Sequence, residues 1–360
     1  MKKILFGLFL IIQFSGAFSQ TLPSWITNMK LKGDFRFREE YKDETGKIER
    51  YRTRIRFRLG FTTLINDKTT LGFRLASGSD PRSTNVTLGD SEANKEISLD
   101  SIYFSYKFSD NTVVWGGKYK SIKYALFRPT DLLWDSDITP EGVGIIFKKD
   151  LSANIGVFFN GSYLVLDEYK SSGADPFLYF FQPGAVFKSG KWTLKGGLAF
   201  YKAVHAQGTI FEYSSGTNTL EDGVLKYQYT VVNPNFELKR KLDYGKVRYV
   251  KFFGEYVKNT QADTNDKGYE FGFAFGNKVK KRGDFEVKCN YRYLEKDAWL
   301  DIFPDSDAFS GKTDVKGTEI AVKYGLGKNT YLTFDFYDMK MISSPETKQK
   351  VVQLDINFKF

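Results

Sequence analysis

The chain has 360 residues, and 53 lysine and arginine side chains against 43 aspartate and glutamate side chains give it a formal net charge of +10. Aromatic residues make up 17% of the sequence, which excludes a disordered chain. Beyond the N-terminal segment no stretch approaches the ~18–20 consecutive apolar residues of a membrane-spanning helix, which excludes a helical membrane protein. A membrane β-barrel is not excluded, because its apolar residues alternate with polar ones.

The N-terminus has the pattern of a secretion signal. A basic start at residues 1–3 precedes an apolar run at residues 4–14, and a small-x-small cleavage site ends at Ser19. We therefore expect residues 1–19 to be a cleaved signal peptide and residues 20–360 to form a single exported domain. The only cysteine cannot form an internal disulfide.

The first two predicted strands alternate strictly between apolar and polar residues. Along residues 51–61, tyrosine, threonine, isoleucine, phenylalanine and leucine occupy one phase, and four arginines occupy the other. Residues 31–41 show the same period of two. Because successive side chains of a strand point to opposite faces, each segment has one charged face and one apolar face.

Similar segments follow along the chain, including residues 269–275, 285–293, 320–326 and 352–360. We count sixteen, with eighteen as the alternative. Short turns such as residues 109–111 alternate with long polar connections. The long connections include residues 78–95, 125–139, 205–223 and 297–313. This alternation is typical of a transmembrane antiparallel up-and-down β-barrel with short periplasmic turns and long extracellular loops.

The arginine row favours a barrel in a membrane over a soluble sheet protein. Neighbouring guanidinium groups ~7 Å apart repel each other by about 0.6 kcal/mol in water and about 2.4 kcal/mol at an effective dielectric of 20. Arginine does not deprotonate, so this face must be wet and the aromatic face must lie in an apolar environment. A propeller would show a repeat of ~40–50 residues, which is absent. A closed barrel leaves no open edge, and sixteen strands leave an aqueous channel.

The first 150 residues resemble the "Putative porin" family of Gram-negative outer membranes. The resemblance rests on segments that recur in the family's order: residues 32–38, 52–60 and 72–78, the Leu99-Asp100 and Gly117-Lys118 pairs, and residues 133–142. It implies a passive pore and leaves the solute open. Ser77 and the Lys120-Ser121 pair depart from the usual pattern. The last strand, which ends on Phe360, resembles the terminal strand that the barrel-assembly machinery reads.

A basic ladder is predicted to line the pore. It comprises Arg36, Arg38, Arg52, Arg54, Arg56, Arg58, Arg74, Lys118 and Lys120. A positive stripe on the lumen raises the local concentration of anions and predicts anion preference. In the alternative interpretation these side chains pair with acids such as Asp34 and Glu40, and selectivity is small.

The connection at residues 127–141 is predicted to narrow the channel. Its charged residues are Arg128, Asp131, Asp135, Asp137 and Glu141. It follows the fifth predicted strand and is the third long loop, which porins commonly fold inward. The aspartates would then face the ladder across a constriction. The alternatives are ordinary aspartate turn chemistry and a calcium site. The spacing is not that of an EF-hand, so we predict no bound metal.

The sequence gives little indication of a catalytic site. His205 is the only histidine and lies at the start of a long polar loop, and no nucleophile is paired with a base. No phosphate-binding loop, zinc spacing or nucleic-acid module is present. We therefore predict no enzyme activity and no cofactor. Aromatic residues near strand ends are predicted to form girdles at the membrane interface, with sugar-stacking tracks inside the lumen as the alternative. They include Trp115, Tyr119, Tyr124, Trp192, Tyr201, Tyr249 and Tyr256.

The sequence as a whole predicts an outer-membrane porin for passive diffusion of small hydrophilic solutes, with anion preference. A substrate-specific channel and a non-conducting structural or adhesive barrel are the alternatives. Expected partners are outer-membrane lipid, lipopolysaccharide, the barrel-assembly machinery through Phe360, and small solutes, with no nucleic acid. Homotrimers are common for barrels of this size, so a trimer is expected by analogy.

Overall fold

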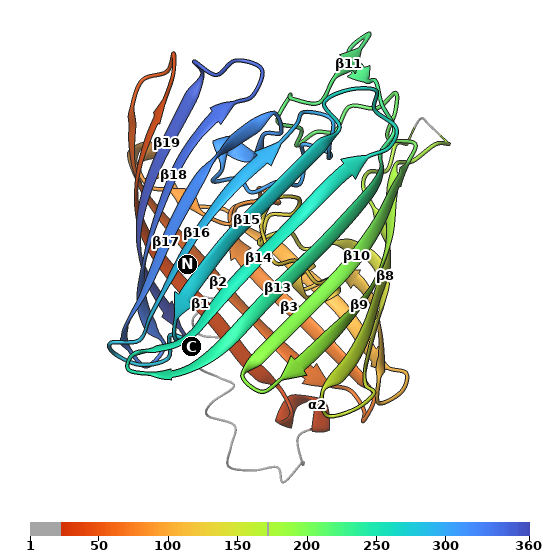
Figure 1. The fold of residues 1–360 in the computed structure, drawn as a ribbon, viewed down its shortest axis with the longest axis vertical. Helices are drawn as coiled ribbons and strands as arrows, with labels where there is room; N and C mark the ends of the chain where they lie inside the picture. The colour runs from red at the N-terminus through yellow and green to blue at the C-terminus, as the bar shows by residue number, and fades with distance from the viewer. Residues whose placement is uncertain (1–22, 171–172) are drawn as a thin grey trace, which may run out of the picture.

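The computed structural model describes residues 23–170 and 173–360, so the predicted signal peptide at residues 1–19 lies outside the described residues. Within the described ranges, sixteen antiparallel strands form a tilted, closed barrel (Figure 1). In chain order the barrel strands are β1 (Lys30–Glu44), β2 (Arg50–Leu64), β3 (Thr69–Ser77), β5 (Ile97–Lys107), β6 (Thr112–Lys118), β7 (Glu141–Asp150), β8 (Ile155–Val165), β9 (Phe177–Ser189), β10 (Trp192–Val204), β13 (Thr230–Tyr244), β14 (Val247–Asn259), β15 (Lys267–Gly276), β16 (Phe285–Leu294), β17 (Val315–Gly327), β18 (Thr330–Met341) and β19 (Lys348–Lys359).

Each barrel strand pairs with its neighbours in the chain, and the last strand closes the barrel on the first. β19 pairs with β1 from Lys359 opposite Asp34 to Gln349 opposite Glu44. The barrel therefore has no open edge whose N–H and C=O groups would lie unpaired in lipid. The predicted all-β class and the count of sixteen are confirmed.

Several short elements were not expected from the period-two pattern. β4 (Val86–Thr87) pairs with β2, and β11 (Leu220–Glu221) and β12 (Val224–Leu225) form a small separate hairpin. The helical turns are α2 (Ser24–Thr27), η1 (Asp90–Glu92), α3 (Ile122–Ala125) and η2 (Phe309–Gly311). Within the described residues, no helix is long and apolar enough to cross a membrane.

Alternation along the strands puts charges inside the barrel and apolar side chains outside. On β2, Arg56 is only 6% exposed, while its neighbour Phe57 is 37% exposed on the outer surface. Across the β1–β2 pair, Phe57 stands opposite Phe35, and Arg56 stands opposite Arg36. Like residues therefore share a face on adjacent strands, as the sequence pattern predicts.

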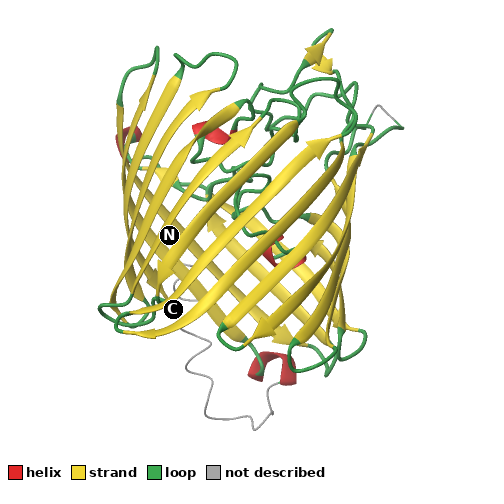
Figure 2. Ribbon diagram, in the orientation of Figure 1, coloured by secondary structure: helices red, strands yellow, loops and turns green. Residues whose placement is uncertain are grey.

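The long connections gather at one end of the barrel and the short turns at the other (Figures 1 and 2). We number the connections at the long-loop end L1 to L8 in chain order. Five of them matter below: L2 (residues 78–96), L3 (119–140), L4 (166–176), L5 (205–229) and L7 (295–314). β6 ends after only seven residues, so L3 begins partway up the wall. Loop segments occupy the barrel interior in Figure 2.

An apolar core lies inside the barrel, on one side of the lumen. Trp134 of L3, together with Trp299 and Phe303 of L7, packs against inward side chains of the wall such as Leu178 and Tyr201. Four of the residues predicted to form an interfacial girdle, Trp115, Tyr119, Tyr201 and Tyr249, are instead buried, whereas Trp192 and Tyr256 are exposed.

Candidate functional site

L3 and L7 are joined to each other inside the barrel. The Asp135 N–H donates to the carbonyl of Phe303 at 2.7 Å, and the Trp299 Nε1–H donates to the carbonyl of Leu133 at 2.7 Å. The rings of Trp134 and Phe303 lie 4.3 Å apart between centroids. The sequence marked L7 only as a long loop, so its role beside L3 was missed.

Between these loops and the opposite wall lies a hollow of about 360 Å³, which we call the constriction hollow. L3 contributes Asp131, Asp135 and Asp137, and L7 contributes Asp305 and Asp307. Its basic lining residues are Arg36, Arg38, Arg56, Arg82, Lys288 and Lys323. The predicted loop aspartates and three of the predicted ladder arginines therefore line one space. Asp305, Asp307 and Arg82 were not singled out from the sequence.

The ladder arginines are held by carboxylates rather than bathed in water. Arg38, only 2% exposed, lies 2.7 Å from Asp355 and 3.3 Å from Asp307. Further ion pairs of the ladder are Arg36–Asp355, Arg38–Glu40, Arg52–Glu40, Arg54–Glu40, Arg56–Asp34, Arg56–Asp137, Arg58–Asp34, Arg58–Asp137, Arg74–Asp100 and Lys118–Glu141. Paired carboxylates thus offset the repulsion within the arginine row.

The three L3 aspartates have different surroundings. Asp137 lies 3.2 Å from Arg58, and although burial alone would raise its pKa, Arg56 and Arg58 hold the pKa of Asp137 below its ordinary value. Asp135 is buried and accepts the N–H groups of Ser306 and Asp137. Burial, with Asp137 and Asp305 nearby, raises the pKa of Asp135 well above its ordinary value. Asp135 therefore takes up a proton more readily than Asp137 does.

The other two predicted residues of this loop, Arg128 and Glu141, interact with nearby side chains. Arg128 pairs with Asp131 and also donates to the carbonyl of Trp134, so it braces L3 from within. Glu141 is the first residue of β7 and pairs with Lys118 at 2.5 Å. Within the described residues, no group of three or more histidine, cysteine, aspartate or glutamate side chains could hold a metal ion.

A second set of cations faces the lumen on the short-turn side of L3. Lys120, Lys148 and Lys195 form no ion pair within the described part of the chain. The Lys120 Nζ lies 4.6 Å from the centroid of the Tyr124 ring, and the Lys195 Nζ lies 4.0 Å from that of Phe127. Burial lowers the pKa of Lys120, and repulsion from Lys32 and Lys148 lowers it further. Of these lysines the sequence singled out only Lys120.

The lone histidine and the lone cysteine lie outside this region. His205 follows β10 and its Nδ1 lies 3.2 Å from the carbonyl oxygen of Asp175 on the exposed long-loop end. Cys289 belongs to the apolar phase of β16, opposite Phe273 and Ile320 on the neighbouring strands.

Comparison with solved structures shows a shared barrel fold at low sequence identity. OmpF of Salmonella typhi, solved as a complex with daunomycin, is 11% identical, with a TM-score of 0.55 over 92% of this chain and 97% of that chain. A loop-deletion mutant of OmpT, an outer membrane protein of Vibrio cholerae, is 11% identical, with a TM-score of 0.51 over 92% and 100%. A mutant of the Rh. blastica porin is 12% identical, with a TM-score of 0.50 over the same shares.

Comparison with sequences gives the family. A search of curated proteins finds no significant match. The family model described as "Putative porin" matches residues 41–242 and 225–360. The match extends well beyond the first 150 residues on which the resemblance was based, although the block at residues 32–38 lies before it. The chain belongs to the "Putative porin" family.

Proposed function

We propose that the chain forms a passive pore for small hydrophilic solutes in the outer membrane. The family and the fold support an outer-membrane porin rather than an enzyme. The observation that carries the proposal is the charged constriction hollow of about 360 Å³ between the wall and the inward loops. A hollow lined by ionised groups keeps water and favours polar solutes over apolar ones.

The ladder alone gives little support for anion preference. Six basic and eight acidic residues line the constriction hollow, and the ladder arginines are all paired. We propose that the preference for anions comes instead from Lys120, Lys148 and Lys195, which have no carboxylate partner in the described residues. Unpaired cations on a lumen wall raise the local anion concentration, and this effect weakens as salt screens them.

Reversal potentials test this proposal in planar bilayers under a KCl gradient. The triple variant Lys120→Gln, Lys148→Gln, Lys195→Gln should lower the chloride-to-potassium permeability ratio by about threefold. Lys149→Gln is the matched control, because Lys149 occupies the opposite phase of β7 from Lys148 and should leave the ratio unchanged. An unaltered ratio in the triple variant would refute the lysine assignment.

The same recordings separate the alternatives. Saturable block by one solute would indicate a substrate-specific channel, and absent conductance in vesicles that hold folded protein would indicate a structural barrel. Recognition of the C-terminal strand by the assembly machinery is likewise proposed. It is supported by Phe360, which is 55% exposed and exchanges backbone hydrogen bonds with Gly33 at the end of the barrel seam.

A further inference from the structure

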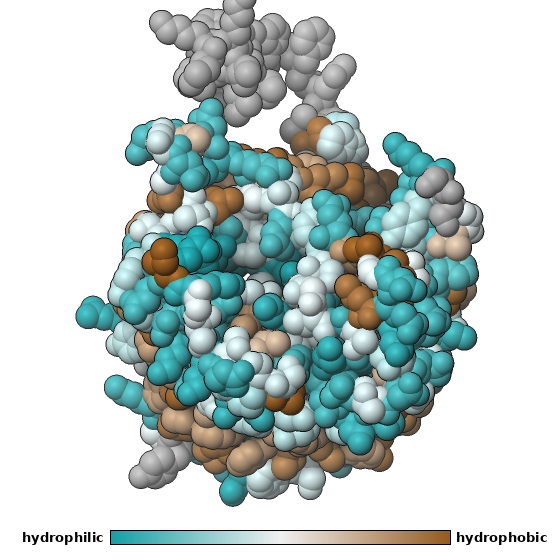
Figure 3. Space-filling model, turned by 90° about the horizontal axis from the view of Figure 1, so that it is seen from above, coloured by the Kyte–Doolittle hydropathy of each residue, from teal (hydrophilic) through white to brown (hydrophobic). Residues whose placement is uncertain are grey.

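A second cavity opens at the long-loop end and is distinct from the constriction hollow. It has a volume of about 530 Å³, and we call it the vestibule pocket. L2, L3, L4, L5 and L7 contribute to its lining, together with the long-loop ends of β5 to β8. Hydrophilic residues cover most of this end of the molecule (Figure 3). The vestibule pocket therefore lies where a solute from the long-loop side first meets the barrel.

One part of the lining is apolar and rigid. Trp134 and Ile138 of L3 line it together with Phe211 of L5 and Phe303 of L7, and all four side chains are buried. These residues belong to the apolar core inside the barrel, so their positions are fixed by packing on the far side. A ring placed on this floor would leave water without disturbing the loops.

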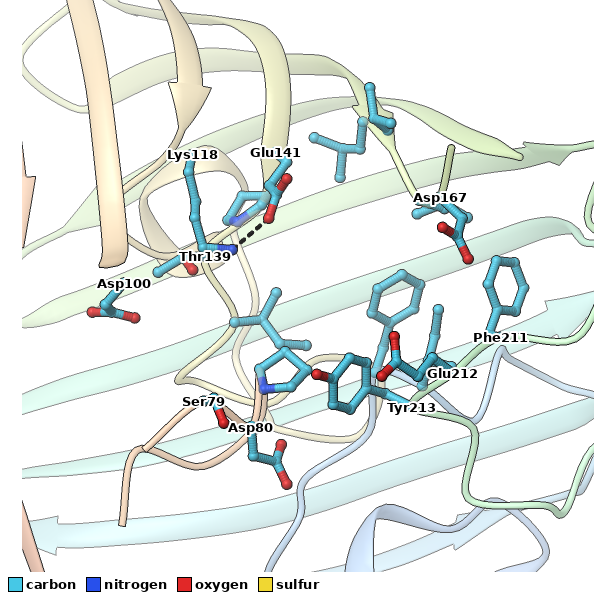
Figure 4. Close-up of a pocket in the computed structure, with 18 of the residues that line it drawn as sticks. Ser79, Asp80, Asp100, Lys118, Thr139, Glu141, Asp167, Phe211, Glu212 and Tyr213 are labelled. Carbon is cyan, nitrogen blue, oxygen red and sulfur yellow. Dashed lines mark hydrogen bonds and ion pairs between the residues drawn. The ribbon is translucent and has the colours of Figure 1, made fainter. Parts of the chain in front are cut away.

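The rim of the vestibule pocket is acidic. Figure 4 shows the carboxylates of Asp80, Asp167 and Glu212 around the hollow, beside the ring of Tyr213. None of these three carboxylates has an ion pair in the residues that the structure describes. Lys118, the one basic lining residue, is neutralised by Glu141 at 2.5 Å.

We infer that the vestibule pocket binds a small organic monocation with an aromatic or other apolar body. The apolar floor takes the body, and the unpaired carboxylates attract the charged group. An anion would be repelled by the rim, and an inorganic cation would gain nothing from the floor. Because unpaired lysines face the lumen further down, the bound cation should obstruct the passage rather than cross it. Only this last consequence rests on the proposed function.

Calorimetry on the purified protein in detergent micelles tests the inference without any need for conductance. Tryptamine is the probe, and indole-3-propionate and indole-3-ethanol carry the same ring with a negative and a neutral group. Tryptamine should bind most tightly, and raised salt should weaken it. Asp80→Asn, Asp167→Asn and Glu212→Gln should each weaken it by about threefold, and the triple variant by about thirtyfold.

Two further variants separate the rim from general effects. Asp222→Asn removes an exposed carboxylate in the β11–β12 turn, outside the lining, and should leave binding unchanged. Tyr213→Ala should weaken tryptamine and indole-3-ethanol alike by about threefold, because it removes a ring from the wall. Equal binding of the three indoles, or equal loss in Asp222→Asn and the triple variant, would overturn the inference. Tryptamine added on the long-loop side should also block current. Absent conductance would contradict the proposed pore, and the calorimetry would still decide whether the vestibule pocket binds the cation.

Discussion

The guanidinium of Arg38 lies at the centre of a buried network that joins the barrel wall to L7. It contacts Asp355 on the adjacent strand and Asp307 of L7, at 2.7 Å and 3.3 Å. Removing one partner of such a group leaves the others charged and without compensation in a site that water hardly reaches. The ladder is therefore a structural feature as well as a lining of the lumen.

Arg38→Met should lower the free energy of unfolding by about 3–5 kcal/mol, because Asp307 loses its ion pair and Asp355 keeps only the one with Arg36. Urea titration of the protein in lipid vesicles measures this change. Asp355→Asn and the double variant complete a cycle, and the double variant should lose less than the sum of the single losses. Lys47→Met is the control, since the Lys47 side chain is 64% exposed. Strictly additive losses would contradict the coupling.

Lys123 should make ion selectivity depend on pH. Burial and the nearby Arg58 lower the pKa of Lys123 to about 8. Its charge is therefore present below that pH and lost above it, so the anion preference should fall from about pH 7 to about pH 9. Reversal potentials across this range measure the fall, and Lys123→Gln should flatten it. A wild-type profile that is already flat would show that Lys123 does not face the ion path.

Single residues were partly predictable from the sequence. Alternation is enough to place Arg52, Arg54, Arg56 and Arg58 on the inner face, because strand geometry fixes the phase. Of the carboxylates that pair with the ladder arginines, only those on the neighbouring strand could be predicted. Asp34 and Glu40 occupy the matching phase of the neighbouring strand, whereas Asp307 is 269 positions away from Arg38 on a loop without periodicity.

At the scale of elements, the pairing of L3 with L7 sets the inner profile of the barrel. Trp299 is fully buried, and its ring lies 5.5 Å from that of Trp134 and 4.9 Å from that of Tyr201 between centroids. It also donates the hydrogen bond to L3. One side chain thus holds both loops against the wall.

Trp299→Ala should release L3 from L7. We expect a loss of about 3–5 kcal/mol in the free energy of unfolding and a noisier, larger single-channel conductance. Trp299→Phe keeps most of the packing but loses the hydrogen bond, so it should cost about 1 kcal/mol and keep the conductance quiet. Trp192→Ala, on an exposed ring, is the control. Unchanged current in Trp299→Ala would show that the loops hold without this contact.

The strands were predictable from period two, but the inward loops were less so. L3 was expected to fold inward only because porins commonly do this, and L7 was not expected to. A signal was nevertheless present: Leu178 and Phe180 put apolar side chains on the inner phase of β9, where a water-facing wall would carry polar residues. A strand that is apolar on both faces indicates a covering layer inside the barrel.

For the whole molecule, closure through β19 and β1 is the decisive contact. Deleting residues 348–360 would expose the edges of β1 and β18, and a folded barrel should not form. Heat-dependent mobility in detergent gels measures this, because only a folded barrel shifts on boiling. Replacing residues 220–224 by Gly-Gly removes the exposed part of the β11–β12 hairpin, keeps the buried Leu225 and should keep the shift. A heat-dependent shift in the β19 deletion would contradict the closure argument.

The apolar core has one more consequence, because it occupies only part of the circumference. Its wall residues lie on β5, β6, β8 to β10, β13 and β14 and at the last residue of β16, while the constriction hollow is lined by β1, β2 and β16 to β18. The water-filled path therefore lies to one side of the barrel axis. Residues on the two sides of the wall are under different constraints. Substitutions on the dry flank should change folding yield, and those on the wet flank should change which solutes pass.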